Sequence, residues 1–338
     1  MIKNACIRSF LKFFPSTPNV SAIFQNILIV SSTGLGDTLW GTPAIRAIKK
    51  QYPKSSLTCL TSSIGKELLR NNPHLDHVLS FQDPLFSKLI PLYRTLKKKY
   101  FDTAILFHTS QRALLPLVKA LNPGTLIATE GLNKGLDALL THPIPLTYEH
   151  EIQRRLHLLK PLQIAPDSLD MELHIDEPFP LPKPPFIALH PGAKDSFKRW
   201  QKEHFISLGQ HLSKKAAILI TGSKAEKALS DEVANSIEGA QSLAGKLTLA
   251  QMAHLLKAAK CFVTNDTGPM HMAAALNTPI LALFGPTDPK RCGPLTSNSR
   301  VISVNKTCLP CLKKKCLSPF CLHQISASNL LNEIDSIL

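Results

Sequence analysis

The stretch "NILIVSSTGLGDTLWGTPAIRAIKKQYP" (residues 26–53) passes from an apolar run through a glycine turn into an amphipathic run. Four consecutive apolar residues, Ile-Leu-Ile-Val, are typical of a buried strand. The turn at Gly34 and Gly36 is followed by apolar residues at helical spacing between 38 and 51. A strand that leads through a tight turn into a helix begins a βαβ unit, so the stretch predicts an α/β protein with a parallel sheet.

The same alternation appears twice along the chain, on either side of the proline-rich stretch "DEPFPLPKPP" (176–185). In the first series the expected strands are 26–32, 56–60 and 103–107, and the expected helices lie near 38–51, 64–71, 111–120 and 149–162. In the second series the expected strands are 186–190, 216–221, 261–264 and 279–284, and the expected helices are 202–213, 224–236, 248–258 and 268–277. The proline-rich stretch fits neither period and indicates a linker.

These patterns predict two doubly wound, Rossmann-like domains that face each other across a cleft. The expected divisions are an N-terminal extension at 1–25, a first domain at 26–175, the linker at 176–185 and a second domain at 186–338. Packing of the last helix back onto the first domain is compatible with this division. Ligands of such sheets bind beyond the carboxyl ends of the strands, so the cleft is the place to search for a site.

Composition limits the partners. The 338-residue chain is 44% hydrophobic and carries a formal net charge of +15. That charge fits either a solvated surface or a field that attracts phosphates, nucleotides or anionic lipid. No arginine-rich arm or aromatic-basic RNA-binding pattern is present, so nucleic acid is not expected as a partner. Cys59 and Cys261 stand alone in apolar runs, as buried thiols do in a reducing cytosol.

The N-terminal segment "MIKNACIRSFLKFF" (1–14) lacks the apolar core and cleavage site of a signal peptide, and no run of the chain is long and apolar enough to span a membrane. Its apolar residues fall broadly on one side of a helix at 2–14, with basic residues toward the other. Two interpretations stay open: a frayed extension, or a helix lying on an anionic inner leaflet.

Asp37 follows the first strand and its glycine turn. A bound NAD would need a third glycine in G-x-G-x-x-G, but position 39 is Leu, and the next strand ends without the acidic residue that holds a ribose. An NAD-dependent oxidoreductase is therefore not favoured. Asp37 could cap the helix, or it could accept a proton from an incoming hydroxyl group.

The stretch "FIALHPGAKDSFKRWQKEHF" (186–205) ends a strand at His190 and Gly192 and then supplies Lys194, Lys198 and Arg199. This basic cluster is either a solvated charge run or the set of cations that neutralises a diphosphate at the carboxyl end of a strand.

The stretch "TNDTGPMHMAAALNTPILALFGPTDP" (264–289) ends another strand and starts a helix. Pro269 suits the first turn of that helix because it has no N–H to leave unpaired. The backbone N–H groups of Thr267, Gly268 and Met270 are expected to be free donors at the positive end of the helix dipole, an anion site for a nucleotide diphosphate. Beside it, Asp266 would be the N-cap or a ligand to a positive or hydroxylic group, and His271 would face the same opening or be a structural residue.

Together these three stretches resemble the bacterial lipopolysaccharide heptosyltransferases, over roughly residues 26 to 325. The matching motifs are "SSTGLGDTLWGTPAIRAIKKQYP", "HPGAKDSFKRW" and "DTGPMHMAAALNTPILALFGPTDP". The resemblance implies the two-domain glycosyltransferase-B fold, inversion at the transferred sugar, and a nucleotide diphosphate donor, usually ADP-heptose. It also implies an acceptor of the lipopolysaccharide inner core, the lipid A-Kdo type, bound by the first domain, with the donor bound by the second.

The resemblance also implies roles for individual residues. Asp37 matches the general base. The positions that match donor-site residues are Lys198, Thr267 and Gly268 for the diphosphate, Asp266, Met270 and His271 beside it, and Glu226 for the nucleoside. The positions that match turns supporting the two sites are Gly34, Gly36, His190 and Gly192. Because the chain has no Asp-x-Asp triplet, no cofactor or catalytic metal is expected, and stabilisation of the leaving group is left to lysine and the helix terminus.

Four cysteines lie close together in "CLPCLKKKCLSPFC" (308–321). Their spacing allows two interpretations: a zinc site, or free or locally paired thiols that hold a turn. The four positions are Cys308, Cys311, Cys316 and Cys321.

The function expected from these patterns is transfer of a heptose or related sugar by a cytoplasmic enzyme associated with the inner face of the inner membrane. The alternatives are a protein of the same fold that binds nucleotide sugars without turnover, and a transferase that uses another nucleotide sugar.

Overall fold

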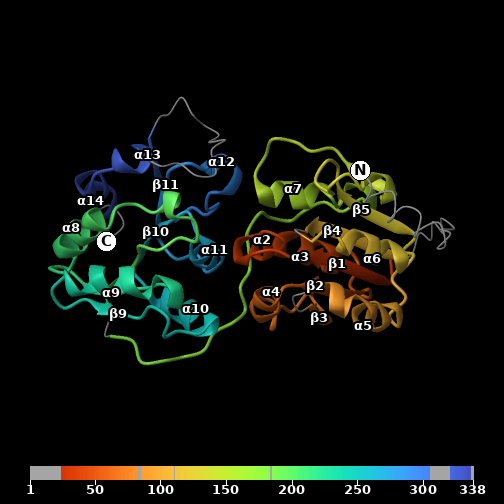
Figure 1. The fold of residues 1–338 in the computed structure, drawn as a ribbon, viewed down its shortest axis with the longest axis horizontal. Helices are drawn as coiled ribbons and strands as arrows, with labels where there is room; N and C mark the ends of the chain where they lie inside the picture. The colour runs from red at the N-terminus through yellow and green to blue at the C-terminus, as the bar shows by residue number, and fades with distance from the viewer. Residues whose placement is uncertain (1–23, 82–84, 110, 183–184, 305–319, 336–338) are drawn as a thin grey trace. The chain divides into compact units, whose positions relative to one another are not determined.

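The computed structural model describes residues 24–81, 85–109, 111–182, 185–304 and 320–335. The predicted helix at 2–14 and three of the four clustered cysteines (Cys308, Cys311, Cys316) lie outside the described residues. The chain divides into two compact units, Met1–His174 and Ile175–Leu338. Figure 1 shows both units and labels most of their helices and strands.

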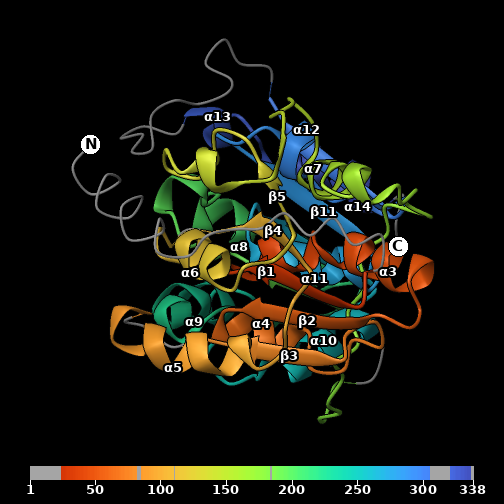
Figure 2. The same cartoon turned by 90° about the vertical axis from the view of Figure 1, so that its right-hand side faces the viewer.

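The first unit is a six-stranded parallel sheet with helices on its faces. Its strands are β1 (Asn26–Ser31), β2 (Ser56–Thr61), β3 (His77–Ser80), β4 (Thr103–His108), β5 (Thr125–Thr129) and β6 (His142–Ile144), and its helices are α2 (Leu35–Leu39), α3 (Thr42–Gln51), α4 (Ser63–Leu68), α5 (Leu85–Lys97), α6 (Leu114–Ala120) and α7 (Glu151–His157). The strand order is β3-β2-β1-β4-β5-β6. Figure 2 shows β3, β2, β1, β4 and β5 in this order from bottom to top.

The second unit repeats this architecture. Its strands are β7 (Phe186–His190), β8 (Ala217–Ile220), β9 (Gln241–Ser242), β10 (Cys261–Asn265), β11 (Ile280–Phe284) and β12 (Ser299–Ser303), and its helices are α8 (Lys202–Leu212), α9 (Lys227–Asn235), α10 (Leu249–Ala258), α11 (Gly268–Ala275), α12 (Pro289–Cys292), α13 (Phe320–His323) and α14 (Ala327–Asp335). The strand order is β12-β11-β10-β7-β8-β9.

In both sheets the order in which successive strands are added reverses beside the first strand. This switch point lies between β1 and β4 in the first unit and between β7 and β10 in the second. In open α/β sheets, ligands bind outside the carboxyl ends of the strands at such a reversal. The fold class predicted from the sequence, two doubly wound Rossmann-like sheets, is confirmed.

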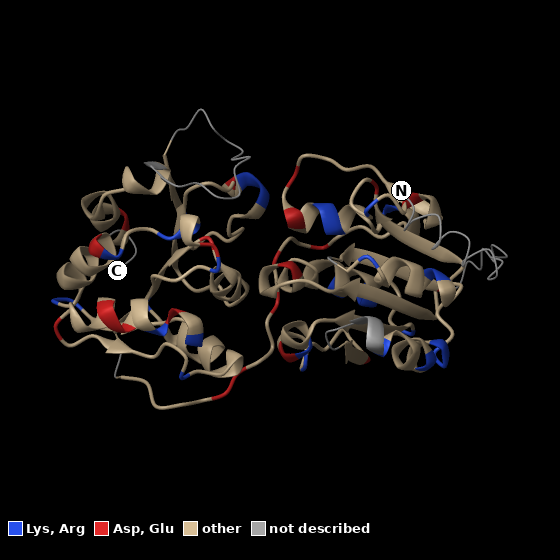
Figure 3. Ribbon diagram, in the orientation of Figure 1, with Lys and Arg blue, Asp and Glu red and all other residues tan. Residues whose placement is uncertain are grey.

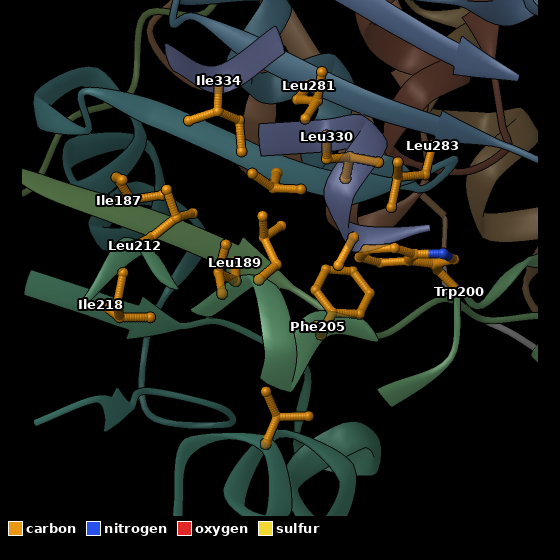
Figure 4. Close-up of a cluster of buried hydrophobic side chains, with 14 of the residues drawn as sticks. Ile187, Leu189, Trp200, Phe205, Leu212, Ile218, Leu281, Leu283, Leu330 and Ile334 are labelled. Carbon is orange, nitrogen blue, oxygen red and sulfur yellow. The ribbon is translucent and has the colours of Figure 1, made fainter. Parts of the chain in front are cut away.

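The core of the second unit explains where the last helix packs. Leu330 and Ile334 of α14 are fully buried against the α8 side of the sheet, where they join Trp200, Phe205 and strand residues of β7 and β11 (Figure 4). The indole N–H of Trp200 donates to the carbonyl oxygen of Ile325, 2.8 Å away, which fixes the start of this last segment. The apolar face of α14 therefore completes the core of its own unit, and packing of the last helix back onto the first domain stays a prediction.

The predicted linker is attached to the second unit at its start. Residues 176–182 form no helix or strand, as the proline content predicts. Asp176 accepts a hydrogen bond from His254 at 2.8 Å, and Glu177 accepts one from Gln251 at 3.2 Å, both on α10. These side chains hold the beginning of the stretch against α10.

One predicted helix, 38–51, is two helices in the structure. The chain turns at Trp40 and Gly41 between α2 and α3. A Cβ at Gly41 would lie 2.8 Å from the Phe107 ring, so only glycine allows β4 to approach this closely. The break places α2 and its Asp37 at the carboxyl edge of the sheet.

Among the described residues, no helix combines the length and the apolar character needed to cross a lipid bilayer.

Candidate active site

Asp37 lies on α2, directly after the first strand of the first unit. The N-cap of α2 is Gly34, which makes no side-chain cap, so the interpretation of Asp37 as the cap is wrong. The Asp37 side chain is 27% exposed, so a solvent-borne group can reach it. At Gly34 the backbone φ is −71°, and an added Cβ would only reach Asp37 Oδ2 at 4.0 Å, so this glycine leaves open space before the carboxylate.

Arg155 holds Asp37 from α7. Its guanidinium is fully buried, and its Nη2 donates to Asp37 Oδ1 over 3.0 Å. Its Nη1 donates to the carbonyl oxygen and to Oε2 of Glu151, both at 2.8 Å, and its Cζ lies 5.2 Å from the Trp40 ring centre. The structure gives Asp37 Oδ2 no partner among the described residues, so that oxygen is left for a substrate.

The charges around Asp37 are balanced within the protein. Burial lowers the pKa of Arg155, but the nearby carboxylates of Asp37 and Glu151 favour its cation. Burial alone would raise the pKa of Glu151, yet Arg155 and Arg154 hold it below its usual value, so Glu151 is ionised at neutral pH. Arg155 forms ion pairs with both Glu151 and Asp37, so its positive charge is not neutralised by Asp37 alone. Figure 3 shows the acidic start of α7 followed by its basic residues.

Sequence patterns did not identify Arg155. The signal was present: Arg154 and Arg155 stand between Ile152 and Leu156, so one of them had to be buried beside apolar residues of the same helix. A buried arginine needs an acid partner, which would have directed the search to Asp37.

In the second unit, Asn265 ties three segments together at the carboxyl ends of β7 and β10. Its Oδ1 accepts from the backbone N–H of Trp200 over 2.9 Å. Its Nδ2 donates to the carbonyl oxygens of Pro191 and Gly192 at 3.0 and 3.1 Å. The His-Pro-Gly turn is therefore fixed beside the start of α11.

Lys198 and Asp266 form an ion pair beside this turn. Lys198 Nζ lies 2.6 Å from Asp266 Oδ2, and the Thr287 hydroxyl donates to the same oxygen, also over 2.6 Å. The Lys198 side chain is 22% exposed and that of Asp266 is 8% exposed. The N-cap of α11 is Thr267, so the interpretation of Asp266 as the cap is wrong, and its carboxylate is the ligand of a cation and a hydroxyl.

The start of α11 supplies two of the three donors expected there. Thr267 and Gly268 are the N-cap and first residue, whose N–H groups have no acceptor within a helix. Pro269 occupies the first turn as predicted. Met270 was expected to be a third donor, which is wrong, because its N–H donates to the carbonyl oxygen of Thr267 over 3.1 Å. His271 is 4% exposed, so most of its surface is inside the unit.

Glu226 lies directly against the His-Pro-Gly turn. An added Cβ at Gly192 would be 2.3 Å from Glu226 Oε1, so the carboxylate rests on the glycine backbone. Burial would raise the pKa of Glu226, but hydrogen bonds from Ser223, together with the charge of Arg199, keep it below its usual value. The predicted role of Glu226 in binding a nucleoside stays a prediction. The structure places its carboxylate against Gly192, in the turn that leads to Lys198.

His190 supports the turn from inside. It is 3% exposed, and its Nδ1 lies 3.0 Å from the Thr221 hydroxyl. Burial lowers the pKa of His190 to about 4, so the ring is neutral near pH 7 and adds no charge to the site.

We expect Gly192→Ala to weaken ADP binding by about tenfold, because the new methyl group must displace either Glu226 or the turn. Isothermal titration with ADP measures this. Gly34→Ala is the matched control, since its methyl group meets only ordinary contacts, and its ADP affinity should equal that of the unchanged protein. Equal affinity in Gly192→Ala would show that this turn is not part of the nucleotide site.

The fourth member of the cysteine cluster, Cys321, is 6% exposed in α13. Within the part of the chain that the structure describes, no three His, Cys, Asp or Glu residues are placed to hold a metal ion. Three of the cluster's members lie outside that part, so the zinc interpretation stays a prediction.

The model of glycosyltransferase family 9 (heptosyltransferase) matches residues 89–321. Lipooligosaccharide heptosyltransferase 2 of Campylobacter jejuni is 24% identical over 328 residues, covering 93% of this chain and 99% of the relative. Among solved structures, E. coli ADP-heptose lps heptosyltransferase II superposes with a TM-score of 0.77 at 23% identity, covering 93% of this chain and 98% of that one. E. coli heptosyltransferase WaaC with ADP superposes with a TM-score of 0.75 at 19% identity, covering 93% and 100%.

The two Rossmann-like sheets give this chain the glycosyltransferase-B fold of these solved structures. Since the family model covers well over half of the sequence, the chain belongs to glycosyltransferase family 9, the heptosyltransferases.

Proposed function

We propose that the protein moves a heptose from ADP-heptose to the inner core of lipopolysaccharide, with inversion at the transferred carbon and without a metal ion. The observation that carries the proposal is Asp37, a partly exposed carboxylate whose Oδ1 is held by buried Arg155 while Oδ2 is left open. The proposal is supported by the names of the relatives, which are lipopolysaccharide heptosyltransferases, and by solved structures of one E. coli heptosyltransferase with ADP and with ADP-2-deoxy-2-fluoro heptose.

In this proposal each unit supplies one part of the reaction. Asp37 accepts the proton of the acceptor hydroxyl as that oxygen attacks the anomeric carbon, and the bond from that carbon to the diphosphate oxygen breaks with its electron pair leaving on ADP. A single displacement of this kind inverts the anomeric carbon. Lys198 and the N–H groups of Thr267 and Gly268 stabilise the diphosphate as its charge grows.

The direct test is to incubate the purified protein with ADP-heptose and a truncated lipid A-Kdo acceptor and to weigh the product. One heptose should be added per acceptor. Parallel reactions with ADP-glucose and UDP-glucose test the alternative of another nucleotide sugar. ADP binding without product from any donor would instead support the alternative of a binding protein that does not turn over.

We expect transfer to continue at an unchanged rate in excess EDTA, because Lys198 and the start of α11 supply the positive charge that a metal would otherwise bring. Initial rates with and without chelator measure this. Loss of activity that Mg²⁺ or Mn²⁺ restores would contradict metal independence.

We also propose a cytoplasmic enzyme held on the inner leaflet by charge, since the chain carries +15 and each basic residue near an anionic surface contributes about 1 kcal/mol. We expect sedimentation with anionic liposomes at low salt and release by about 0.5 M salt. Deletion of residues 1–20 should weaken the binding. Equal binding to neutral and anionic liposomes would rule out the electrostatic contribution, and unchanged binding after the deletion would rule out the N-terminal segment.

A further inference from the structure

Helix α5 packs onto the first unit through one side only. Leu89, Leu92 and Tyr93 contact the hydrophobic cluster that the strands and α6 form, and Leu96 is fully buried in that cluster. These four positions recur at three- and four-residue spacing, so they form one apolar stripe along the helix. The packing of α5 therefore uses this stripe and leaves the opposite side of the helix for other contacts.

The opposite side of α5 carries three cations and one large apolar residue. Ile90, Arg94, Lys97 and Lys98 stand at positions i, i+4, i+7 and i+8, so they share one face of the helix, here called the α5 face. Arg94, Lys97 and Lys98 are exposed, and Ile90 is 66% exposed. With a rise of about 1.5 Å per residue, this face is about 12 Å long.

The charge of the α5 face is not balanced by acids. The sequence has no Asp or Glu between Asp83 and Asp102, and Figure 3 shows basic but no acidic residues along the described part of α5. Within the part of the chain that the structure describes, Arg94, Lys97 and Lys98 form no ion pair. All three charges are therefore available to an anionic partner.

The exposed apolar residue helps to choose among the partners that this charge attracts. Charge alone would fit a nucleic acid, an acidic protein or an anionic lipid. Ile90 gains nothing from a phosphate backbone, whereas at a membrane it leaves water for the boundary between head groups and acyl chains. Tyr100, which follows three consecutive lysines and is 79% exposed, is of a residue type enriched at that boundary. The combination of cations with exposed apolar and aromatic side chains fits a lipid surface best.

We propose that the α5 face docks the first unit onto an anionic phospholipid membrane. Arg94, Lys97 and Lys98 contact the lipid phosphates, and Ile90 inserts below the head groups. The proposal deepens the proposed attachment to the membrane by naming a surface for it, and it rests on the proposed function only in taking the acceptor to be a lipid.

The first test measures sedimentation of the full chain with vesicles of phosphatidylglycerol and phosphatidylethanolamine. It compares the unchanged protein with the triple variant Arg94→Gln, Lys97→Gln and Lys98→Gln. Each basic residue near an anionic surface strengthens binding by about fivefold, so the triple variant should bind about 100-fold more weakly at low salt. Unchanged binding would overturn the proposal and leave the α5 face to a nucleic acid or an acidic protein.

A second triple variant is the matched control. Lys214→Gln, Lys246→Gln and Lys260→Gln remove the same charge from exposed positions of the second unit, and binding should stay within about threefold of that of the unchanged protein. Equal losses in the two triple variants would mean that net charge, rather than the α5 face, determines binding, and would also overturn the proposal.

Substitutions of Ile90 test the inserted residue. Ile90→Ser should weaken vesicle binding by about tenfold at low salt, because the apolar contribution is lost. In Ile90→Trp the new indole should emit at shorter wavelength when anionic vesicles are added, and lipids brominated on their acyl chains should quench it. The unchanged protein, with Trp40 and Trp200, gives the background. An indole at position 90 that neither shifts nor is quenched would overturn the proposal.

Transfer to a water-soluble, deacylated acceptor separates this proposal from the proposed function. The α5 triple variant should show the kcat and KM of the unchanged protein with that acceptor, because no membrane is involved. A loss of activity toward it would place these residues in the acceptor site and overturn the docking role. If the unchanged protein transfers no heptose at all, the proposed function fails, and vesicle binding by the variants still decides whether the α5 face docks.

Discussion

Replacing Asp37 by asparagine is expected to lower kcat by about 100-fold or more while leaving ADP affinity within about twofold. The amide group of asparagine cannot take the proton of the attacking hydroxyl, so the transition state loses its base. ADP binding is unaffected because the nucleotide contacts proposed above, Lys198 and the start of α11, belong to the other unit.

The local structure should survive this substitution. The amide oxygen of asparagine can still accept the 3.0 Å hydrogen bond from Arg155, and Glu151 remains to balance the buried guanidinium. A melting temperature within a few degrees of the unchanged protein is therefore expected, and a pH profile of the residual activity without the acid limb would agree with loss of a base.

Glu130→Gln serves as the control, since Glu130 is an exposed carboxylate at the end of β5, on the same edge of the same sheet. Its rate should be unchanged. If Asp37→Asn kept near-normal turnover with a charged acceptor, Asp37 would not be the general base.

The sequence predicted the strands of each sheet near the reversal points almost to the residue, because they are short apolar runs bounded by turns. β7 was expected at 186–190 and is Phe186–His190. The strands that were missed are β3, β5 and β6 in the first sheet and β9 and β12 in the second. His77 and His142 are exposed, and a half-exposed edge strand lacks the continuous apolar run used to find the others. β5 is buried, but it holds only three consecutive apolar residues, 126–128.

Site residues that follow a strand directly were also found from sequence, since the carboxyl ends of parallel strands gather at one edge. The sequence patterns could not predict ion-pair and hydrogen-bond partners that are far apart in the chain. Arg155 meets Asp37 from 118 residues away, and Thr287 meets Asp266 from 21 residues away. Such pairs depend on how helices and loops pack on the sheet, which local periodicity does not encode.

The same limit explains the errors. Asp37 and Asp266 each stand near a helix start, where capping is the usual role of an acidic residue. In the structure the N-cap residues are Gly34 and Thr267, and each aspartate carboxylate forms an ion pair with a basic side chain instead of capping the helix. The long-range ion pair outweighs the local capping bond because each aspartate has a basic partner within 3.0 Å.

Replacing Lys198 by methionine is expected to have the second large effect, a fall in kcat/KM for ADP-heptose of about 100-fold or more. The substitution keeps most of the apolar stem of the side chain and removes its charge. Asp266, 8% exposed, is then left with the Thr287 hydroxyl and no cation among its described partners. The diphosphate would meet an uncompensated carboxylate at the position where it should meet a lysine.

This reasoning makes a sharper prediction for the double variant Lys198→Met with Asp266→Asn. Removing the carboxylate as well removes the repulsion, so ADP affinity should recover by about tenfold relative to Lys198→Met, whereas turnover should stay low because the leaving diphosphate still lacks its cation. Lys214→Met, an exposed lysine of the same unit outside this loop, should behave like the unchanged protein. Additive losses in the double variant would mean that Asp266 itself binds the donor, and that the Lys198 charge acts on the nucleotide without regard to its ion pair.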